Sequence, residues 1–445
     1  MFCLKRRALS QMTWPETDPV TPPAGAATLP LPQATTMFGD TIAAEDVVAY
    51  IEHGTAAFHR TNLALFAAGF STFALLYCVQ PLMPLFTGEF GVGPAESSLS
   101  LSLTTGTLAF AMLVASALSE AWGRKPVMVA SLFASAVLTI LGALMPSWHG
   151  LLVLRALMGL SLSGLPAVAM AYVSEEMHPK SVGLAMGLFI GGSAMGGLGG
   201  RLIAGVVTDL ATWRIGLGVV GITGLVCAWA FWRSLPPSAH FQARPLKPRL
   251  LLAAFADHLR DPGLRWLFLE GFLLMGAFVT LYNYTGFRLL APPYGLSQTA
   301  VAAIFVVYLV GIVASIWVGD LAGKLGRRRV FWAPIVLMLA GAALTRSGSL
   351  WVIIAGIAIV TFGFFGAHSV ASSWVGRRAL HARAQASSLY LFFYYLGSSV
   401  AGSLGGMAWT RSGWDGVTLL IGGLALAALA VAVRLIALPP RQPQG

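Results

Sequence analysis

Three titratable side chains, those of Arg155, Glu270 and His368, lie inside long apolar stretches of the chain. An arginine at the centre of a membrane helix costs about 2.5–3.5 kcal/mol on insertion scales, so such a residue has a partner, faces water or carries function. A carboxyl group or an imidazole in such a place can bind a proton and release it when its surroundings change. We therefore predict that Glu270, Arg155 and His368 couple the protein to protons.

Each of the three residues also has a simpler interpretation. Arg155 lies about five residues from the start of its apolar stretch, so its guanidinium could extend to the membrane surface. Glu270 lies about one turn inside its stretch, where the helix dipole favours a carboxylate. His368 could simply hydrogen-bond a neighbour. Arg201, inside another apolar stretch, is a candidate either for function or for bracing the interface between the two halves of the chain.

Two charged stretches have the same order of residue types: "SALSEAWGRKPVMV" at 116–129 and "GDLAGKLGRRRV" at 319–330. Each places an acid before a glycine and basic residues directly after it. Glycine permits a tight turn, and the basic side chains can bond the carbonyl groups that end the preceding helix. We predict that these stretches form conformational latch loops through eight residues: Glu120, Gly123, Arg124, Lys125, Asp320, Gly326, Arg327 and Arg328.

The two loops differ in the position of the acid. Glu120 stands four residues before Arg124, whereas Asp320 lies further from the glycine of its own loop. Side chains four residues apart share a helix face, so we expect the first loop to hold the tighter ion pair within itself. Two acidic residues further along the chain, Glu175 and Glu176, are expected to pair with Lys180 or Arg383.

The composition shows what kind of element must position these residues. Of the 445 residues 57% are hydrophobic and only 10% are charged, and the mean hydropathy is +0.76. A soluble domain carries about 25% charged residues, so this composition indicates an integral membrane protein. Cys3, Cys78 and Cys227 have no metal-ligand spacing. We predict no metal and no cofactor.

Spanning the hydrocarbon layer takes about 20 apolar residues in a helix. Stretches of that kind predict an all-α membrane protein with twelve transmembrane helices: 61–88, 97–119, 126–146, 151–174, 181–208, 215–232, 266–287, 297–319, 330–345, 349–376, 384–410 and 416–433.

The lysines and arginines predict the orientation of these spans. Of the 28 basic residues, 22 fall in the termini and in alternate loops, and only Arg214, Arg288, Arg346 and Arg411 fall in the loops between. Because cytoplasmic loops carry the excess of Lys and Arg, both termini are predicted to be cytoplasmic. The formal net charge of +11 is then a consequence of topology, which excludes nucleic acid as a partner. We expect the chain to act as a monomer in the lipid bilayer.

Polar intervals divide the chain into five parts. Residues 1–60 contain six prolines and no span, which predicts a disordered cytoplasmic tail, with Met37 as an alternative start of translation. Residues 233–265 predict a cytoplasmic central loop with a surface helix at 250–259. This loop separates two six-helix bundles, 61–232 and 266–437, and residues 438–445 form the C-terminal tail.

The two halves of the chain resemble each other. "GGSAMGGLGG" at 191–200 corresponds to "GSSVAGSLGG" at 397–406, and Gly123 corresponds to Gly326. Four such correspondences have offsets between 202 and 206 residues. Internal repeats at a near-constant offset are the mark of many transporter folds, so we predict a duplicated six-helix unit.

The motifs resemble those of a known family. "SALSEAWGRK" and "GDLAGKLGRR" look like the loop signature of the major facilitator superfamily, roughly G-x-L-a-D-r-x-G-r-K. "RALMG" at 155–159 resembles its fourth-span arginine signature, with Met158 where glutamine is common. "GGSAMGGLGGRLIAG" at 191–205 resembles the antiporter motif without its Gly-Pro pair. Over residues 60–437 the chain is similar to bacterial inner-membrane drug or sugar efflux permeases of the twelve-span drug:proton antiporter type.

This resemblance implies two bundles that rock about a central cavity lined by the first, fourth, seventh and tenth spans. Polar residues of those spans are the candidates for the substrate cavity: Tyr77, Gln80, Arg155, Ser163, Tyr282, Asn283, His368 and Ser372. The expected partners are a small-molecule substrate, protons and the lipid bilayer.

The first hypothesis is therefore a secondary active transporter that exports a small organic solute across the bacterial inner membrane in exchange for protons. Nothing resembles a nucleotide-binding P-loop, so ATP is not the direct energy source. A proton symporter or facilitator that imports a metabolite is the alternative, because the first span lacks a carboxylate and the fifth lacks the Gly-Pro pair. A non-transporting sensor is more remote, and the lack of a His/Asp cluster or a Ser–His pair argues against an enzyme.

Overall fold

The structure is a computed structural model that describes residues 50–243 and 248–438, with Ser116 described by its backbone alone. The predicted tail up to residue 49, Met37 and the end of the chain lie outside these ranges. Within them the chain is helical and contains no strand, only an isolated β-bridge between Ile51 and Met177. The all-α class is therefore confirmed for the described residues.

The first half of the chain forms a bundle that we call the N-terminal bundle. In it α1 packs most extensively on α8, α5 on α9, and α4 on α6. Its elements are α1 (Ala56–Tyr77), the 3₁₀ turn η1 (Gln80–Leu82), α2 (Met83–Phe90), α3 (Pro94–Ser97), α4 (Leu99–Trp122), α5 (Arg124–Ala143), α6 (Trp148–Leu162), α7 (Pro166–Glu176), α8 (Val182–Leu210) and α9 (Trp213–Ser234).

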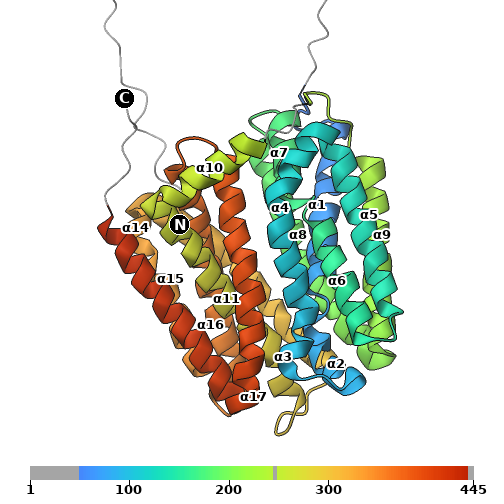
Figure 1. Ribbon diagram of the computed structural model, residues 1–445, viewed down its shortest axis with the longest axis vertical. Helices are drawn as coiled ribbons and strands as arrows, with labels where there is room; N and C mark the ends of the chain where they lie inside the picture. The colour runs from blue at the N-terminus through green and yellow to red at the C-terminus, as the bar shows by residue number, and fades with distance from the viewer. Residues whose placement is uncertain (1–49, 244–247, 439–445) are drawn as a thin grey trace, which may run out of the picture. The chain divides into compact units, whose positions relative to one another are not determined.

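The second half forms the C-terminal bundle, which lies beside the first (Figure 1). In it α11 packs most extensively on α17, and α16 packs on α13 and α15. Its elements are α11 (Pro262–Leu290), α12 (Gln298–Ile304), the 3₁₀ turn η2 (Phe305–Val307), α13 (Tyr308–Leu325), α14 (Arg327–Val330), α15 (Trp332–Leu344), α16 (Leu350–Arg378) and α17 (Arg383–Ala437).

Helix α10 (Pro248–Arg260) joins the two bundles. It confirms that the central loop contains a helix where the sequence predicts one, and it lies across the end of the molecule in Figure 1. One face of α10 is apolar while Arg249, Asp257 and Arg260 make the helix strongly amphipathic. Its place on a membrane surface stays a prediction.

Nine helices in the described part of the chain are long and apolar enough to cross a membrane. The twelve-span prediction differs from this number at three places. Helix α4 has 24 residues, of which only the apolar part Leu99–Ala115, before Ser116, is counted, and α15 has 13 residues. Helix α17 contains two predicted spans, because the backbone is non-helical at Ser412 and Gly413 and the chain reverses direction there.

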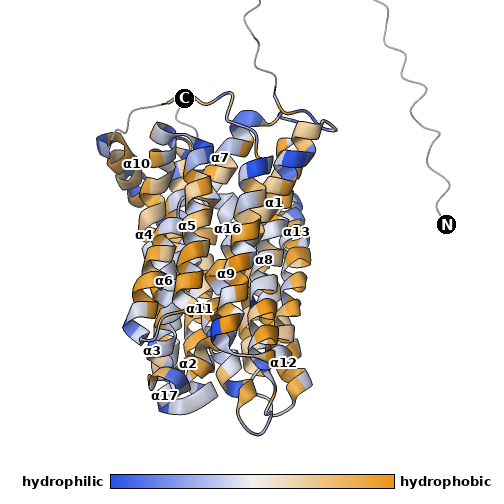
Figure 2. Cartoon of the chain, turned by 90° about the vertical axis from the view of Figure 1, so that its right-hand side faces the viewer, coloured by the Kyte–Doolittle hydropathy of each residue, from blue (hydrophilic) through white to orange (hydrophobic). Residues whose placement is uncertain are grey.

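The helices alternate in direction, so their connections gather at two ends. We call the end that holds the start of α1, α10 and the end of α17 the terminal end, and the other the far end, where α2, α3 and α12 lie (Figure 2). Short side-chain caps end the loops of the far end. Ser147, Thr212 and Ser297 each accept a hydrogen bond from a backbone N–H in the first turn of the following helix.

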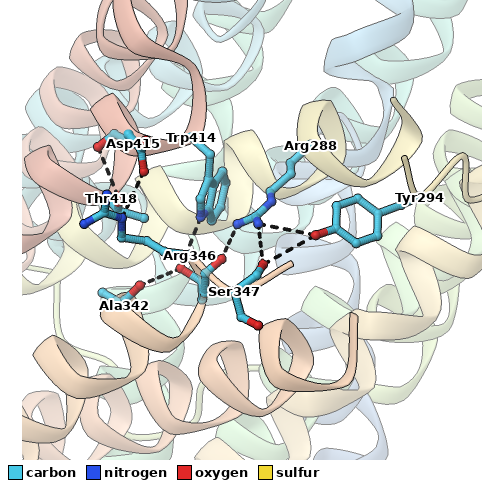
Figure 3. Close-up of polar contacts among 9 residues, drawn as sticks. Arg288, Tyr294, Ala342, Arg346, Ser347, Trp414, Asp415 and Thr418 are labelled. Atoms are coloured by element: carbon cyan, nitrogen blue, oxygen red, sulfur yellow. Dashed lines mark hydrogen bonds and ion pairs between the residues drawn. The ribbon is translucent and has the colours of Figure 1, made fainter. Parts of the chain in front are cut away.

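Arginines fix the far end of the C-terminal bundle (Figure 3). Arg288, near the end of α11, donates to the carbonyl oxygen of Ser347 at 2.7 Å and lies 4.9 Å from the ring of Trp414. Arg346 donates to the Asp415 carboxylate at 2.9 Å. These contacts join α11, the connection between α15 and α16, and the second arm of α17.

The glycines of the internal repeat explain the closest helix contacts. A Cβ atom at Gly200 of α8 would lie 2.5 Å from the backbone of Ala74 in α1. Gly397 of α17 lies against the backbone of Phe272 in α11 in the same way. Small residues let the backbones of membrane helices approach, so glycines of the motif serve close packing in both bundles. The equivalent positions differ in their partners, because Gly406, which corresponds to Gly200, packs on the backbone of Ala95 in α3.

Candidate functional site

Four polar side chains, three of them buried and that of Tyr308 half-buried, form a network between the bundles, which we call the central network. Gln80 and Arg201 come from η1 and α8 of the N-terminal bundle, whereas Asn283 and Tyr308 come from α11 and α13 of the C-terminal bundle. Helix α1 ends at Tyr77, and a 3₁₀ turn containing a proline follows, so the chain turns at Gln80 instead of continuing as an α-helix. That break aims the Gln80 amide at the other bundle.

Arg201 is the charged member of the central network and has no exposed surface. Its Nε donates to Oε1 of Gln80 at 2.7 Å, one Nη donates to the hydroxyl of Tyr308 at 3.1 Å, and the other donates to the carbonyl oxygen of Gly197. Aromatic rings enclose the guanidinium at 4.6–4.7 Å from its carbon atom: those of Tyr77, Phe305 and Tyr308. Arg201 therefore braces the interface between the bundles, one of the two roles that the sequence left open.

Asn283 completes the bridge between the bundles. Its Oδ1 accepts a hydrogen bond of 2.7 Å from Nε2 of Gln80, while its Nδ2 is buried without a partner. The neighbouring Tyr282 is also buried, and its hydroxyl lies 2.6 Å from Oγ1 of Thr361. Because buried amide groups are normally satisfied, the free Nδ2 of Asn283 marks a place where a further acceptor would be favourable.

Two more contacts join the bundles toward the far end, and we call them the far-end gate. The carboxylate of Asp209 in α8 accepts from the backbone N–H groups of Gln298 and Thr299, at 3.1 and 2.7 Å, in the first turn of α12. The hydroxyl of Ser399 in α17 donates to the carbonyl oxygen of Ser102 in α4 at 2.7 Å. Neither contact was predicted, because each depends on which helices meet.

Arg155 lies beside the central network but bonds only within its own bundle. Arg155 is 2% exposed, and its guanidinium donates to the carbonyl oxygens of Leu75, Leu76 and Ser100 at 3.1, 2.8 and 2.7 Å. The first two carbonyls belong to the last turn of α1, which is short of helical donors and carries the negative end of the dipole. Arg155 thus fixes the place where α1 ends, directly before Gln80.

The structure brings the two other proton candidates near each other through a residue that the sequence did not single out. His368 of α16 has its Nδ1 2.9 Å from the hydroxyl of Tyr390 in α17. Tyr390 packs against α11 at Gly271, next to Glu270, and lies within electrostatic range of its carboxylate. Both carboxylate oxygens of Glu270 are buried without a hydrogen-bond partner. We call Glu270, Tyr390 and His368 the acid–histidine cluster.

The remaining cavity candidates make local contacts. Ser163 donates to the carbonyl oxygen of Leu160, and Ser372 donates to that of Ser369. These are hydrogen bonds within one turn of helix, which leave Ser163 and Ser372 outside the central network. Tyr77 lies next to the central network, because the guanidinium of Arg201 packs over its ring.

The latch loops have the predicted turns but different ion pairs. Gly123 and Gly326 have φ angles of 98° and 91°, which only glycine adopts readily. Arg124 holds Glu175 of α7 at 3.2 and 2.7 Å, while Glu120 lies 4.0 Å away. The expectation that Glu175 pairs with Lys180 or Arg383 is therefore wrong, because the turn at Gly123 directs the Arg124 side chain across the bundle to α7.

In the second loop the ion pair stays inside the loop. Asp320 lies 2.6 Å from Lys324, one helical turn ahead, and both side chains are exposed. The predicted asymmetry is thus reversed, and the second loop holds the tighter internal pair. Asp320 and Lys324 lie four residues apart on the same helix, α13, whereas the turn at Gly123 separates Glu120 from Arg124, which pairs with Glu175 instead. Arg327 instead donates to the hydroxyl of Ser373 in α16 at 3.0 Å.

Three other residues in or near these loops are Lys125, Arg328 and Glu176. Lys125 donates to the carbonyl oxygen of Leu235 at the end of α9, as expected for a basic residue near a helix C-terminus. Arg328 is half-buried and lines a surface pocket with Arg377 and Arg378. Glu176 accepts from the backbone N–H of His240 at 3.0 Å, which corrects its predicted pairing with Lys180 or Arg383.

Comparison with known proteins agrees with this architecture. A family model described as Major Facilitator Superfamily matches residues 65–402 and 277–445. The chain is 50% identical over 380 residues to the uncharacterized MFS-type transporter YybF of Bacillus subtilis (strain 168), a match that covers 85% of this chain and 94% of the relative. It is 51% identical over 391 residues to the inner membrane transport protein YnfM of Escherichia coli (strain K12), covering 87% and 93%.

A solved structure has the same fold. The crystal structure of the nucleoside transporter NupG matches with a TM-score of 0.68 at 16% identity, covering 84% of this chain and 99% of that one. At this identity the likeness concerns the fold alone.

Proposed function

This chain belongs to the Major Facilitator Superfamily and is a multi-pass membrane transporter of small molecules, not an enzyme, and on that premise we propose that it exports a small organic solute across the bacterial inner membrane in exchange for protons. The superfamily predicted from the loop and span motifs is confirmed. The observation that carries the proposal is the central network, in which a buried arginine, two amides and a tyrosine join the two bundles.

The proposed arrangement in the membrane follows the charges. We place the terminal end in the cytoplasm because 22 of the 28 basic residues belong to that side or to the termini. Twelve spans in two six-helix bundles, residues 61–232 and 266–437, then have both ends of the chain inside. The name of the YnfM relative as an inner membrane protein supports this location.

Alternating access requires two states that differ in which end is closed. The central network and the far-end gate hold the bundles together toward the far end. Among the helix pairs in extensive contact, α3 and α4 meet α17 and α8 meets α12, whereas α7 at the terminal end of the first bundle contacts only its own bundle extensively. This pattern supports a state that is closed toward the periplasm and accessible from the cytoplasm, acting as a monomer.

The acid–histidine cluster is the proposed proton site. An ionised carboxylate buried without a partner is costly, and a proton on Glu270 removes that cost while this state lasts. When the bundles rearrange and water reaches α11, the same carboxyl can ionise. His368 and Tyr390 form a hydrogen-bonded pair beside it that can pass the proton toward the central cavity.

The test is solute-driven proton movement in everted vesicles or proteoliposomes. We expect proton flux with wild-type protein and its loss in Glu270→Gln, because glutamine keeps the shape of the side chain but cannot carry the proton. Glu89→Gln is the matched control, since Glu89 is exposed and pairs with Arg214 at 3.1 Å. Solute movement without any pH change in wild type contradicts proton coupling, and full flux in Glu270→Gln moves the coupling role to His368.

A proton symporter or facilitator remains the second candidate. It is favoured by the lack of a carboxylate in the first span and of a Gly-Pro pair in the fifth. The direction of flux in the same vesicles separates the two, because an imposed proton gradient drives solute against the proton flow in an antiporter and with it in a symporter.

A further inference from the structure

Arg201 carries a permanent charge whose counter-charge is missing in this state. The guanidinium is fully buried, and its three hydrogen bonds go to an amide oxygen, a hydroxyl and a backbone carbonyl, all of them neutral. No carboxylate lies within 4.0 Å of it among the described residues. Buried charges in proteins are normally paired with an opposite charge. An anion bound here would supply the counter-charge that Arg201 lacks.

The donors around this point are not exhausted. The three hydrogen bonds of Arg201 occupy three of the five N–H groups of a guanidinium. Asn283 adds a buried Nδ2 that has no partner. Gln80 lies between the two residues and bonds to both of them, through Oε1 on one side and Nε2 on the other.

The Gln80 amide is a planar group with two polar atoms, and it presents one of them to Arg201 and the other to Asn283. A carboxylate has the same planar shape with two oxygens and no hydrogens. In that position its first oxygen would accept from Arg201 in a charge-assisted bond. Its second would accept from the Nδ2 of Asn283 after a half-turn of that amide, whose Oδ1 faces Gln80 in the present state. Both groups that are unsatisfied in the present state, one a charge and one a donor, would be satisfied by a single ligand.

We propose that the transported solute is an organic monocarboxylate, whose carboxylate replaces the Gln80 amide between Arg201 and Asn283. This assignment rests on the proposed transport function and names its substrate class. One negative charge matches one free positive charge, because the other buried arginine of the region, Arg155, is held by three carbonyl oxygens. The rings of Tyr77, Phe305 and Tyr308 around the guanidinium supply contact for an aromatic or other apolar body.

The proposal also connects binding to movement. The Gln80–Asn283 hydrogen bond joins the two bundles, and the Arg201–Tyr308 hydrogen bond is a second link across the same interface. A carboxylate that takes over these donors disconnects Gln80 from the C-terminal bundle. Because a ligand shifts a conformational equilibrium only by its differential affinity for the two states, the loss of this bridge favours the state that opens toward the far end.

The test measures ligand binding by purified full-length protein in nanodiscs, so that it is independent of transport. The probes are benzoate, phenylacetate and octanoate, each compared with its neutral primary amide, by isothermal titration calorimetry and by ligand-induced thermal stabilisation. We expect at least one carboxylate to bind the wild type, and to bind it at least ~30-fold more tightly than its amide, since loss of a buried charge-assisted partner has about that effect.

Two substitutions locate the binding. Arg201→Gln removes the charge and should abolish the preference for carboxylate over amide, while Arg201→Lys should retain part of it. Gln80→Glu places a fixed carboxylate against Arg201, so this variant should fold, melt at a temperature at least as high as the wild type, and no longer bind the carboxylates. Gln80→Glu gives Arg201 a charged partner instead of removing one. This variant therefore decides the test even if Arg201→Gln does not fold.

Three outcomes overturn the anion assignment: no carboxylate binds better than its amide, the preference persists in Arg201→Gln, or Gln80→Glu binds the carboxylates as the wild type does. Failure of the proposed function has a different signature. If the carboxylates bind as expected but no solute or proton moves in vesicles, coupled transport is wrong and the site stands. If a cationic or neutral solute is exchanged for protons in a Glu270-dependent way and Arg201→Gln has no effect, transport stands and the anion site is wrong.

Discussion

The three residues predicted to couple to protons differ in what they bond. Arg155 uses carbonyl oxygens of its own bundle, so its charge is part of the architecture of α1. Glu270 bonds to no described group, and the imidazole of His368 pairs with Tyr390. A buried group that is fully satisfied has little reason to change during transport, whereas an unsatisfied one gains from a proton or a ligand.

Arg155 should therefore matter for stability. Arg155→Leu leaves three buried carbonyl oxygens without their donor, and we expect the free energy of unfolding to fall by about 3 kcal/mol. Arg155→Lys keeps one charge-assisted bond to the end of α1 and should lose less. The measurement is thermal unfolding in detergent, with Arg411→Leu in the exposed turn of α17 as control. A variant Arg155→Leu with wild-type stability and a loss of proton flux alone would instead support a relay role.

At the scale of elements, close helix contacts and short connections set the geometry of the site. Helix α8 approaches α1 through glycines on one face, and this approach brings Arg201 to the break after Tyr77. The turn at Gly123 directs Arg124 toward α7. In both cases a glycine places the charged side chain that directly follows it in the sequence.

The α1–α8 contact gives the first prediction at this scale. Gly200→Val places a side chain against the backbone of Ala74, and we expect a loss of about 2–3 kcal/mol in the free energy of unfolding. Gly187→Ala is the matched control in the same helix, since nothing lies within 4 Å of its Cβ position; it should be neutral or stabilising by up to ~1 kcal/mol. Equal melting temperatures for the two variants would show that α8 does not depend on this approach.

The latch loops give the second prediction at the scale of elements. Glu175→Gln removes the closest carboxylate of the buried Arg124, and we expect it to lower stability by about 2 kcal/mol. Asp320→Asn breaks a pair in which both side chains are exposed, and exposed pairs contribute only about 0.2–1 kcal/mol. The two variants are compared by thermal unfolding at low and high salt. A larger loss for Asp320→Asn, or a loss for Glu175→Gln that vanishes in salt, would contradict this ordering.

At the scale of the whole molecule, the two bundles share one apolar cluster, and a few polar contacts lie at the same interface. The central network and the far-end gate are the hydrogen bonds of this interface, and they stand beside apolar contacts such as that between the rings of Phe110 and Phe392. Links of this size, each with a net value of about 0.5–1.5 kcal/mol, suit an interface that must separate during every transport cycle.

Asp209 tests this view. In Asp209→Ala the first turn of α12 loses its two carboxylate bonds, and we expect the population open toward the far end to rise by roughly 5–30-fold, as a change of ~1–2 kcal/mol implies. The readout is the labelling rate of a cysteine at position 102, in a background without Cys3, Cys78 and Cys227, by a membrane-impermeant thiol reagent. Glu89→Ala is the control at the same end. An unchanged labelling rate in Asp209→Ala would show that this contact does not hold the gate.

The sequence by itself determined the membrane character, the superfamily, the turns of the latch loops and most helix boundaries. These properties follow from local composition and spacing, because crossing a bilayer requires long apolar helices and tight turns require glycine. It also identified Gln80, Asn283, Glu270 and His368 as unusual, since polar groups in apolar spans are costly wherever they lie.

Only the tertiary structure decided which of these residues meet. Arg201 bonds to Gln80, 121 positions away in the sequence, and to Tyr308, 107 positions away. Arg124 pairs with Glu175, which lies closer to it than the acid of its own loop. A partner is chosen by distance in space and by burial, and the reversal of the expected loop asymmetry shows that spacing along one helix does not decide it. The physical reason is that a charge removed from water binds the nearest group that can compensate it, and the packing of helices far apart in the chain determines which group that is.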